Sequence, residues 1–167
     1  RLTKLGYIDY DGRVTSKGEF CTRIYSNEIL IGEIFATDFY KGLDEFQILM
    51  LVASAAYEPR EKTEIFRQFK SPALSDLKKK IKNHDILFKE HQLKYLDEIS
   101  GLVYPCFDGK TIFEIIQNTN MLEGDIVRFF RQVLDKIQQI KNATDDEILR
   151  QIMQNLQERV LMCLRNI

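Results

Sequence analysis

The residue types in this sequence that could support chemistry are two histidines and three cysteines. His84 and His91 lie seven residues apart, whereas two metal ligands on one helix face normally stand three or four residues apart. Cys21, Cys106 and Cys163 show no metal-ligand spacing, and their odd number is typical of reduced thiols. We therefore interpret both histidines as half-buried packing residues, predict no metal site, and expect an intracellular protein, cytoplasmic or, in a eukaryote, nuclear.

A possible phosphate-binding sequence occurs at Gly109-Lys110-Thr111. The complete motif needs a second glycine five residues before Gly109, where the sequence has Tyr104. Thr111 and Glu114 instead have the spacing of a helix capping box. We find no catalytic constellation, so we expect the isolated chain to have no ATPase activity and to hold no cofactor.

Polar side chains of a kind that can contact nucleic acid recur along the helix expected after Asp125. The polar stripe, spaced four, three and four residues apart, is Arg128, Gln132, Asp135 and Gln139, with Arg131 and Gln138 beside it. Amide, guanidinium and carboxylate groups can bond to the bases and sugars of a single strand. The alternative is an ordinary solvent-exposed face, and periodicity alone does not decide between the two.

A second candidate surface is basic. Residues 60–94 hold ten basic and five acidic side chains, although the whole chain has 24 basic and 25 acidic ones. The centre of this excess is Lys78, Lys79, Lys80 and Lys82. These lysines could contact a phosphate backbone or an acidic partner, or simply form a solvated helix face. The balanced total excludes a histone-like polybasic protein.

The elements that must position these residues are helices. Only 8 glycines and 3 prolines interrupt 167 residues, a length that can bury a core without disulfides or metals. Apolar periodicity predicts helices over about 18–37, with a break near residues 26–27, from 44 to 57, over 71–100, from 111, after 125 and from 144, where Thr144 and Glu147 are predicted to cap the last helix. Ser71 and Pro72 give the long helix over 71–100 its start signal. The fold class is an all-α helical bundle.

The N-terminal segment has a different pattern. Residues 7–10 and 13–15 are predicted as short strands, and Asp11-Gly12 between them is typical of a hairpin turn. A helix end, this β-ribbon and a new helix would be the remnant of a winged helix. We therefore expect residues 1–20 to end a winged-helix domain and residues 21–167 to form the bundle. The chain does not begin with Met, and we interpret it as a piece of a longer protein.

Two stretches of the sequence carry a family pattern. Residues 5–21, LGYIDYDGRVTSKGEFC, lead into residues 28–43, and residues 109–128 read GKTIFEIIQNTNMLEGDIVR. The first stretch resembles the passage from the winged helix to the terminal helical domain in superkiller-type DExH RNA helicases, which include exosome-associated helicases. The second resembles their DSHCT domain. Together the two cover nearly the whole chain, with residues 58–100 the least distinctive.

This resemblance implies a function for the intact protein. It would be an ATP-dependent RNA helicase of superfamily 2, a hydrolase whose nucleotide-binding domains use ATP and Mg, and it would serve RNA degradation. This chain would contribute contact with single-stranded RNA, or alternatively DNA, and docking to the helicase core of the same polypeptide and to an RNA-degrading complex. No membrane is implied. The strand would lie along the helix after Asp125, at positions matching Gln132 and Asp135.

The sequence departs from the family pattern at several positions. The family more often has Arg at the position of Gln132 and Glu at that of Asp135, so we expect weaker phosphate attraction here. Cys106 replaces a usual tryptophan, and Pro105 falls where the family commonly has helix, which predicts a disturbed helix before Gly109.

Two other functions remain open on the sequence alone. A winged-helix regulator of DNA would need a complete recognition helix. The sequence contains only the wing that follows such a helix. A pure protein-interaction bundle would leave the polar stripe without a role.

Overall fold

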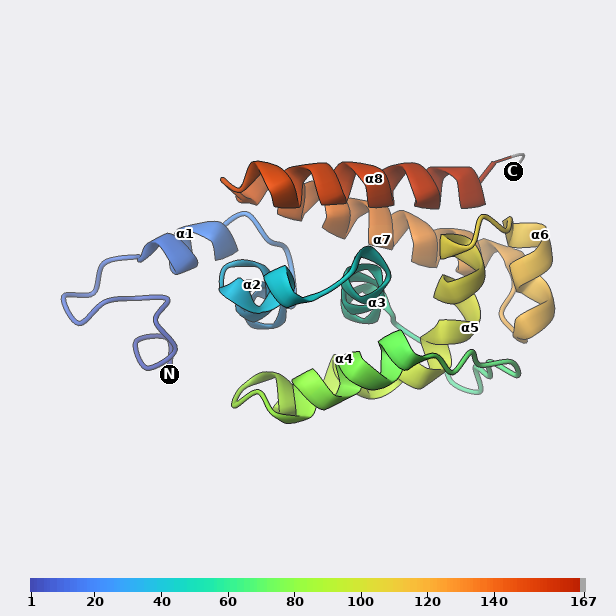
Figure 1. Cartoon of the computed structure of the whole chain (residues 1–167), viewed down its shortest axis with the longest axis horizontal. Helices are drawn as coiled ribbons and strands as arrows, with labels where there is room; N and C mark the ends of the chain where they lie inside the picture. The colour runs from blue at the N-terminus through green and yellow to red at the C-terminus, as the bar shows by residue number, and fades with distance from the viewer. Residues whose placement is uncertain (166–167) are drawn as a thin grey trace.

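The computed structural model of the protein describes residues 1–165; Asn166 and Ile167, the end of the predicted bundle, lie outside the described residues. The chain is mainly helical (Figure 1), which confirms the predicted all-α bundle. The α-helices are α1 (Ser16–Cys21), α2 (Glu28–Phe35), α3 (Glu45–Ala56), α4 (Pro72–Lys82), α5 (Leu96–Phe107), α6 (Ile112–Ile115), α7 (Glu123–Ala143) and α8 (Glu147–Cys163). Short 3-10 turns are η1 (Asp38–Gly42), η2 (Leu87–Lys89), η3 (His91–Tyr95) and η4 (Ile116–Asn118).

Helix α3 is the centre of the bundle. It is buried from Phe46 to Ala56, as expected for a helix that is apolar nearly all round. In Figure 1 it is seen almost end-on, with α7 and α8 side by side across one side of it and α4 and α5 on the other. A capping box begins α3: the Asp44 carboxylate accepts from the Gln47 N–H at 2.8 Å, and the Gln47 amide accepts from the Asp44 N–H at 2.9 Å.

The predicted β-ribbon is wrong. Within residues 1–165 the hairpin contributes only an isolated antiparallel bridge between Ile8 and Val14. The Asp9 carboxylate accepts from the N–H groups of Asp11 and Arg13, both at 2.9 Å, so a side chain organises the turn. The backbone bonds on either side are too few to build strands, since a lone two-stranded hairpin is marginally stable in water.

The predicted long helix over residues 71–100 is also wrong. Helix α4 ends at Lys82, and residues 83–95 contain two short 3-10 turns, η2 and η3, before α5 begins at Leu96. The His84 Nδ1 atom accepts from the N–H groups of Ile86 and Leu87, at 3.1 and 3.0 Å, and takes donors that a continuing helix would need. As a result His84 is half-buried as predicted, whereas His91 and Phe88 are exposed.

Helix α5 continues through Pro105, contrary to the disturbed helix that we expected. A proline has no N–H to donate to the carbonyl four residues earlier, which is that of Gly101. The Asn118 side-chain amide donates to this carbonyl instead, at 3.0 Å. Gly101 itself allows the segment over residues 65–67 to pass close by, because a Cβ there would stand 2.1 Å from the Arg67 carbonyl oxygen.

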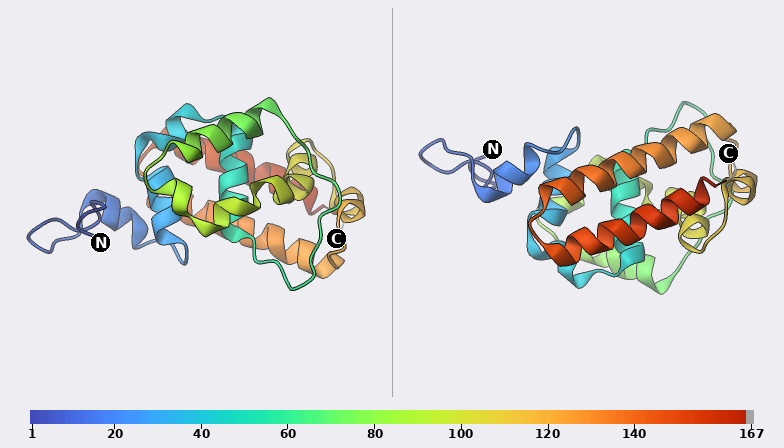
Figure 2. Two further views of the ribbon diagram at one scale, coloured as in Figure 1. Left: turned by 90° about the horizontal axis from the view of Figure 1, so that it is seen from below. Right: turned by 90° about the horizontal axis from the view of Figure 1, so that it is seen from above.

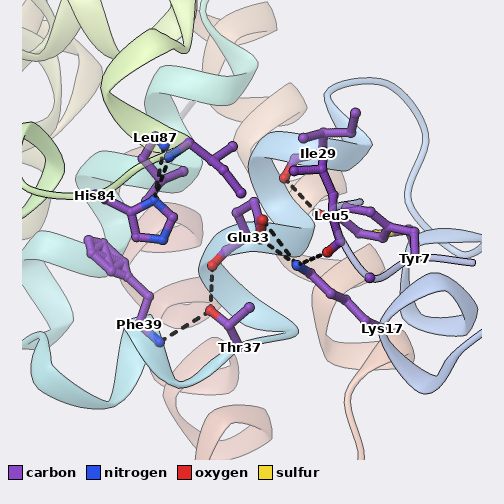
Figure 3. A network of polar contacts seen from close by, with 12 residues as sticks. Leu5, Tyr7, Lys17, Ile29, Glu33, Thr37, Phe39, His84 and Leu87 are labelled. Carbon is purple, nitrogen blue, oxygen red and sulfur yellow. Dashed lines mark hydrogen bonds and ion pairs between the residues drawn. The ribbon is translucent and has the colours of Figure 1, made fainter. Parts of the chain in front are cut away.

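The N-terminal segment projects from one end of the bundle and is held there by a buried charge (Figure 2). Lys17 of α1 donates to the Leu5 carbonyl at 2.8 Å and pairs with the Glu33 carboxylate at 2.7 Å. Figure 3 shows this contact, together with the Tyr7 hydroxyl that donates to the Ile29 carbonyl. Glu33 is 1% exposed, and the ion pair with Lys17 compensates the burial of its carboxylate.

Candidate nucleic-acid interface

Helix α7 presents the polar stripe on the side away from the core, as its sequence predicts. The residues of its inner face, which packs against α3 and α8, are Ile126, Val127, Phe130, Val133, Ile137 and Ile140, all buried, and Leu134, half-buried. On the outer face Arg128, Arg131 and Asp135 are exposed, and Gln132 and Gln139 are half-buried. The structure therefore places all five predicted contact residues on one accessible side of α7.

Three adjoining hollows follow the polar stripe. The first lies between residues 57–63 and the start of α7, the second lies along the outer side of α7, and the third lies beside residues 25–26. Gln132 lines all three, while Arg128 lines the first two and Asp135 the last two. We call this surface the α7 groove; its polar lining residues include Tyr25, Ser26, Glu58, Arg60, Asp125, Arg128, Arg131, Gln132, Asp135 and Gln139.

The arginines of the α7 groove lie at the end near the start of α7. Arg128 and Arg131 are exposed there beside the exposed Glu123, and the Arg60 guanidinium pairs with the Asp125 carboxylate at 3.1 Å. Guanidinium groups can hold phosphate oxygens in a bidentate manner. Sequence reasoning did not find Arg60, because only the folded chain brings residue 60 next to residue 125.

The other end of the α7 groove is acidic at its surface. Glu58 and Asp135 are exposed there, whereas Lys136 is 6% exposed and donates inward. Its Nζ atom donates to the Tyr25 carbonyl, to the Ser26 carbonyl at 2.7 Å and to the Ser26 hydroxyl at 3.0 Å. Burial lowers the pKa of Lys136, although the nearby carboxylates oppose this shift. The charge of Lys136 is thus used to hold the chain between α1 and α2.

The structure also explains the predicted break between α1 and α2. Ser26 and Asn27 have φ angles of 64° and 53°, a left-handed conformation that no helix continues. The Asn27 side-chain amide donates to the Ala55 carbonyl at 2.9 Å, and Lys136 donates to Ser26. These bonds compensate the unfavourable backbone and dock the connection onto α3 and α7.

The four predicted basic residues lie elsewhere, on α4, and the structure does not bring them to the α7 groove (Figure 1). Lys78 pairs with Asp97 of α5 at 2.9 Å. Lys80 pairs with Asp76 at 3.1 Å and donates to the Gly42 carbonyl at 2.7 Å. Lys79 and Lys82 are exposed.

The glycine, threonine and cysteine residues considered for chemistry in the sequence have structural roles instead. Gly109, with φ of 90°, follows the end of α5, and Thr111 precedes α6. The Thr111 side chain makes no capping hydrogen bond, so the predicted capping box is wrong.

Cys106 and Cys163 are both buried, and a hydrogen bond between their thiols, together with burial, raises the pKa of Cys106. Across residues 1–165 there is no cluster of three metal-ligating side chains, and no helix has the length and apolar character to cross a membrane.

Together, the fold and the groove define a helical domain with a mixed polar groove along one long helix. Residues 11–162 match the family described as DSHCT (NUC185) domain. Because this match covers most of the chain, the chain belongs to the DSHCT domain family, and the resemblance found in the sequence is confirmed.

Two proteins resemble most of this chain, and both are much longer than it. The chain is 24% identical over 157 residues to "mRNA transport homolog 4" of Caenorhabditis elegans, covering 85% of this chain and 15% of that protein. It is 26% identical over 156 residues to "DExH-box ATP-dependent RNA helicase DExH10" of Arabidopsis thaliana, covering 86% of this chain and 16% of that protein. The chain therefore spans about a sixth of the length of these relatives.

Proposed function

We propose that this chain is the C-terminal helical bundle of an ATP-dependent RNA helicase of the superkiller type, and that its α7 groove contacts the single-stranded RNA. The family match and the relative named as an RNA helicase support the first part. The observation that carries the second is the position of the polar stripe, which lines three adjoining hollows on the side of α7 away from the core.

The chemistry of the groove suits weak and reversible contact with a strand. Arg128 and Arg131 supply positive charge for phosphates, while Gln132 can donate to or accept from a base. Asp135 accepts only, from a base amino group or a ribose 2′-hydroxyl. Each such bond contributes about 1 kcal/mol net, so the strand can advance without one strong bond holding it back.

The intact protein would supply the rest of the reaction. ATP and Mg would bind to its motor domains, and the isolated chain would hydrolyse no ATP. The bundle would dock on the helicase core of the same polypeptide, and exposed Leu2 and Val14 in the N-terminal segment favour such a contact. An RNA-degrading complex would be a further partner, and DNA is the alternative nucleic acid.

The test is a double substitution, Gln132→Ala with Asp135→Ala, in the intact helicase. We expect RNA unwinding to slow more than ATP hydrolysis, because strand contact is lost while the ATP site is untouched. The free energy of unfolding should change by less than about 0.5 kcal/mol, since Asp135 is exposed and Gln132 is only half-buried.

The matched control is Gln151→Ala with Glu158→Ala, which removes an amide and a carboxylate from the outer face of α8. This control should leave both rates unchanged. If the protein is only an interaction bundle, the groove variant will also unwind RNA at the normal rate, and the groove then has no part in the mechanism.

A further inference from the structure

A large aromatic side chain stands at the acidic end of the α7 groove. Tyr25, in the connection between α1 and α2, is 74% exposed. It lines the same hollow as Gln132, Asp135 and Gln139, three members of the polar stripe. Sequence reasoning gave Tyr25 no role, because it is more than 100 residues away from the stripe along the chain.

The backbone of Tyr25 is fixed although its side chain is exposed. Its N–H donates to the Gln139 side-chain oxygen at 2.9 Å, and its carbonyl accepts from Lys136. Before it, Ile24 is buried at 3% exposure and the Arg23 guanidinium donates to the Asn142 carbonyl at 3.1 Å. The ring is thus presented from a connection that is docked on α7 on both sides of Tyr25.

We propose that Tyr25 is a stacking platform for one base of the single-stranded RNA, at the end of the α7 groove opposite Arg128. This inference rests on the function proposed above and extends it. Aromatic side chains stack on any base, so the contact would be tolerant of sequence. An exposed ring on an ordered backbone also loses little conformational freedom when a base covers it.

The charges along the groove favour this arrangement. Arg128 and Arg131 line the hollows at the start of α7 and attract phosphates there. The charged residues that line the hollow beside Tyr25 are Glu58, Asp135 and Lys136, and the two carboxylates also border the arginine hollows. The three N–H groups of the Lys136 ammonium are used by Tyr25 and Ser26, so Lys136 offers no hydrogen-bond donor to a phosphate at this end. Carboxylates disfavour a phosphate and can accept from base amino groups and 2′-hydroxyls, so the uncharged parts of a nucleotide fit this end. Residues 128 and 139 are roughly 17 Å apart along the helix axis, which separates the two ends of the strand contact.

The most direct test uses fluorescence, because the chain contains no tryptophan. The variant Tyr25→Trp of the whole 167-residue chain is titrated with a single-stranded 12-nucleotide oligouridylate at low salt. We expect its tryptophan emission to be quenched as RNA binds. The matched control is Tyr10→Trp, at a side chain that is 95% exposed in the N-terminal hairpin and should not be quenched.

A binding series measures the contribution of the ring. Tyr25→Ala should weaken binding of the labelled oligouridylate about tenfold, which corresponds to about 1.4 kcal/mol, while Tyr25→Phe should keep near-normal affinity. On an abasic strand of the same length the wild type and Tyr25→Ala should bind equally, because no base is present to stack.

The two proposals can fail separately. If the wild type binds oligouridylate but Tyr25→Ala binds equally well and Tyr25→Trp is not quenched, the stacking inference is overturned and the proposed function stands. If the wild type does not bind oligouridylate while circular dichroism shows it folded, RNA contact by this chain is overturned and stacking with it.

Discussion

The α7 groove and the α4 lysines are both rows of polar or charged side chains on amphipathic helices, yet the structure uses them differently. On α4, Lys78 and Lys80 are engaged within the domain, in contacts with α5 and with the end of η1. On α7, Arg128 and Arg131 remain exposed and line a hollow. The difference indicates that charge density along a helix is a poor guide to a binding surface.

The α7 groove is formed by segments of the chain that pack on either side of the helix. The connection at residues 25–26 and the segment at residues 57–63 both pack beside α7 and bound hollows along it. The segment after α3 is held by residues 118–120, where the Asn120 side chain accepts from the Glu64 N–H at 2.8 Å. Contacts between distant parts of the sequence therefore turn the polar stripe of α7 into a concave surface.

Among the tests of this comparison, Lys136→Met is expected to have the largest effect, on the free energy of unfolding. The substitution removes the donor to the Tyr25 and Ser26 carbonyls and leaves these groups unpaired beside α7. Relief of the desolvated charge offsets part of the loss, so we expect the free energy of unfolding to fall by about 2 kcal/mol. Urea denaturation followed by circular dichroism measures it.

The control for that substitution is Lys79→Met on α4, where the side chain is exposed. It should change the free energy of unfolding by less than about 0.5 kcal/mol. An equal loss for the two variants would mean that Lys136 is not a structural anchor.

The next largest effect is expected on the affinity for RNA when the exposed arginines of α7 are replaced. Arg128→Gln with Arg131→Gln should weaken binding of a single-stranded oligouridylate about tenfold at low salt, or about 1.4 kcal/mol. The slope of log affinity against log salt should fall by about 1.4, because two phosphate contacts are lost. Fluorescence anisotropy measures both quantities.

On α4, Lys79→Gln with Lys82→Gln removes the same amount of charge from two exposed lysines. We expect less than about a twofold change in affinity from this variant, as for general attraction at a distance beyond the Debye length. If both pairs weaken binding equally, the protein attracts RNA by its overall field and the α7 groove is not a specific contact.

Those parts of the fold that depend on local pattern could be predicted from the sequence. The apolar positions of α3 and α7 are buried where periodicity places them, and the helix predicted from residue 44 has Asp44 as its N-cap. The polar stripe follows from the same periodicity, so the residues of the candidate site could be named before the structure.

The predictions that were wrong concern positions where neighbouring groups compete for the backbone hydrogen bonds. Periodicity continues smoothly through His84, but its ring nitrogen takes backbone donors and ends the helix pattern. Pro105 has the opposite outcome, because Asn118, 13 residues later, satisfies the carbonyl that the proline leaves free. Arg60 and Tyr25 join the α7 groove only through long-range packing, which no local pattern reports.

A smaller effect concerns the ion pair between Lys78 and Asp97. Both side chains are about half exposed, at 49% and 51%, so solvent screens their attraction. A double-mutant cycle with Lys78→Ala and Asp97→Ala should give a coupling energy of about 0.5 kcal/mol, decreasing at high salt. A coupling near zero would mean that Lys78 is available to a ligand after all, and the contrast with α7 would weaken.

The smallest effect concerns Asp76, which holds Lys80 on α4. Hydrogen bonds from Gln47 and then from Lys80 lower the pKa of Asp76 below its ordinary value of 3.8. A carboxyl group whose pKa is depressed by folding stabilises the folded state above its unfolded pKa, and this contribution is lost as the pH falls through the folded pKa. Asp76→Asn should therefore lower the melting temperature slightly at pH 7, and the gap from wild type should close as the pH falls below about 3.8. Thermal melts at pH 7, 4 and 3 measure this gap, and a gap that stays constant across the series would show that the Asp76 charge does not hold α4. Closure of the gap would instead support the view that Lys80 on α4 serves the packing of the domain, whereas Arg128 and Arg131 of α7 are left for a ligand.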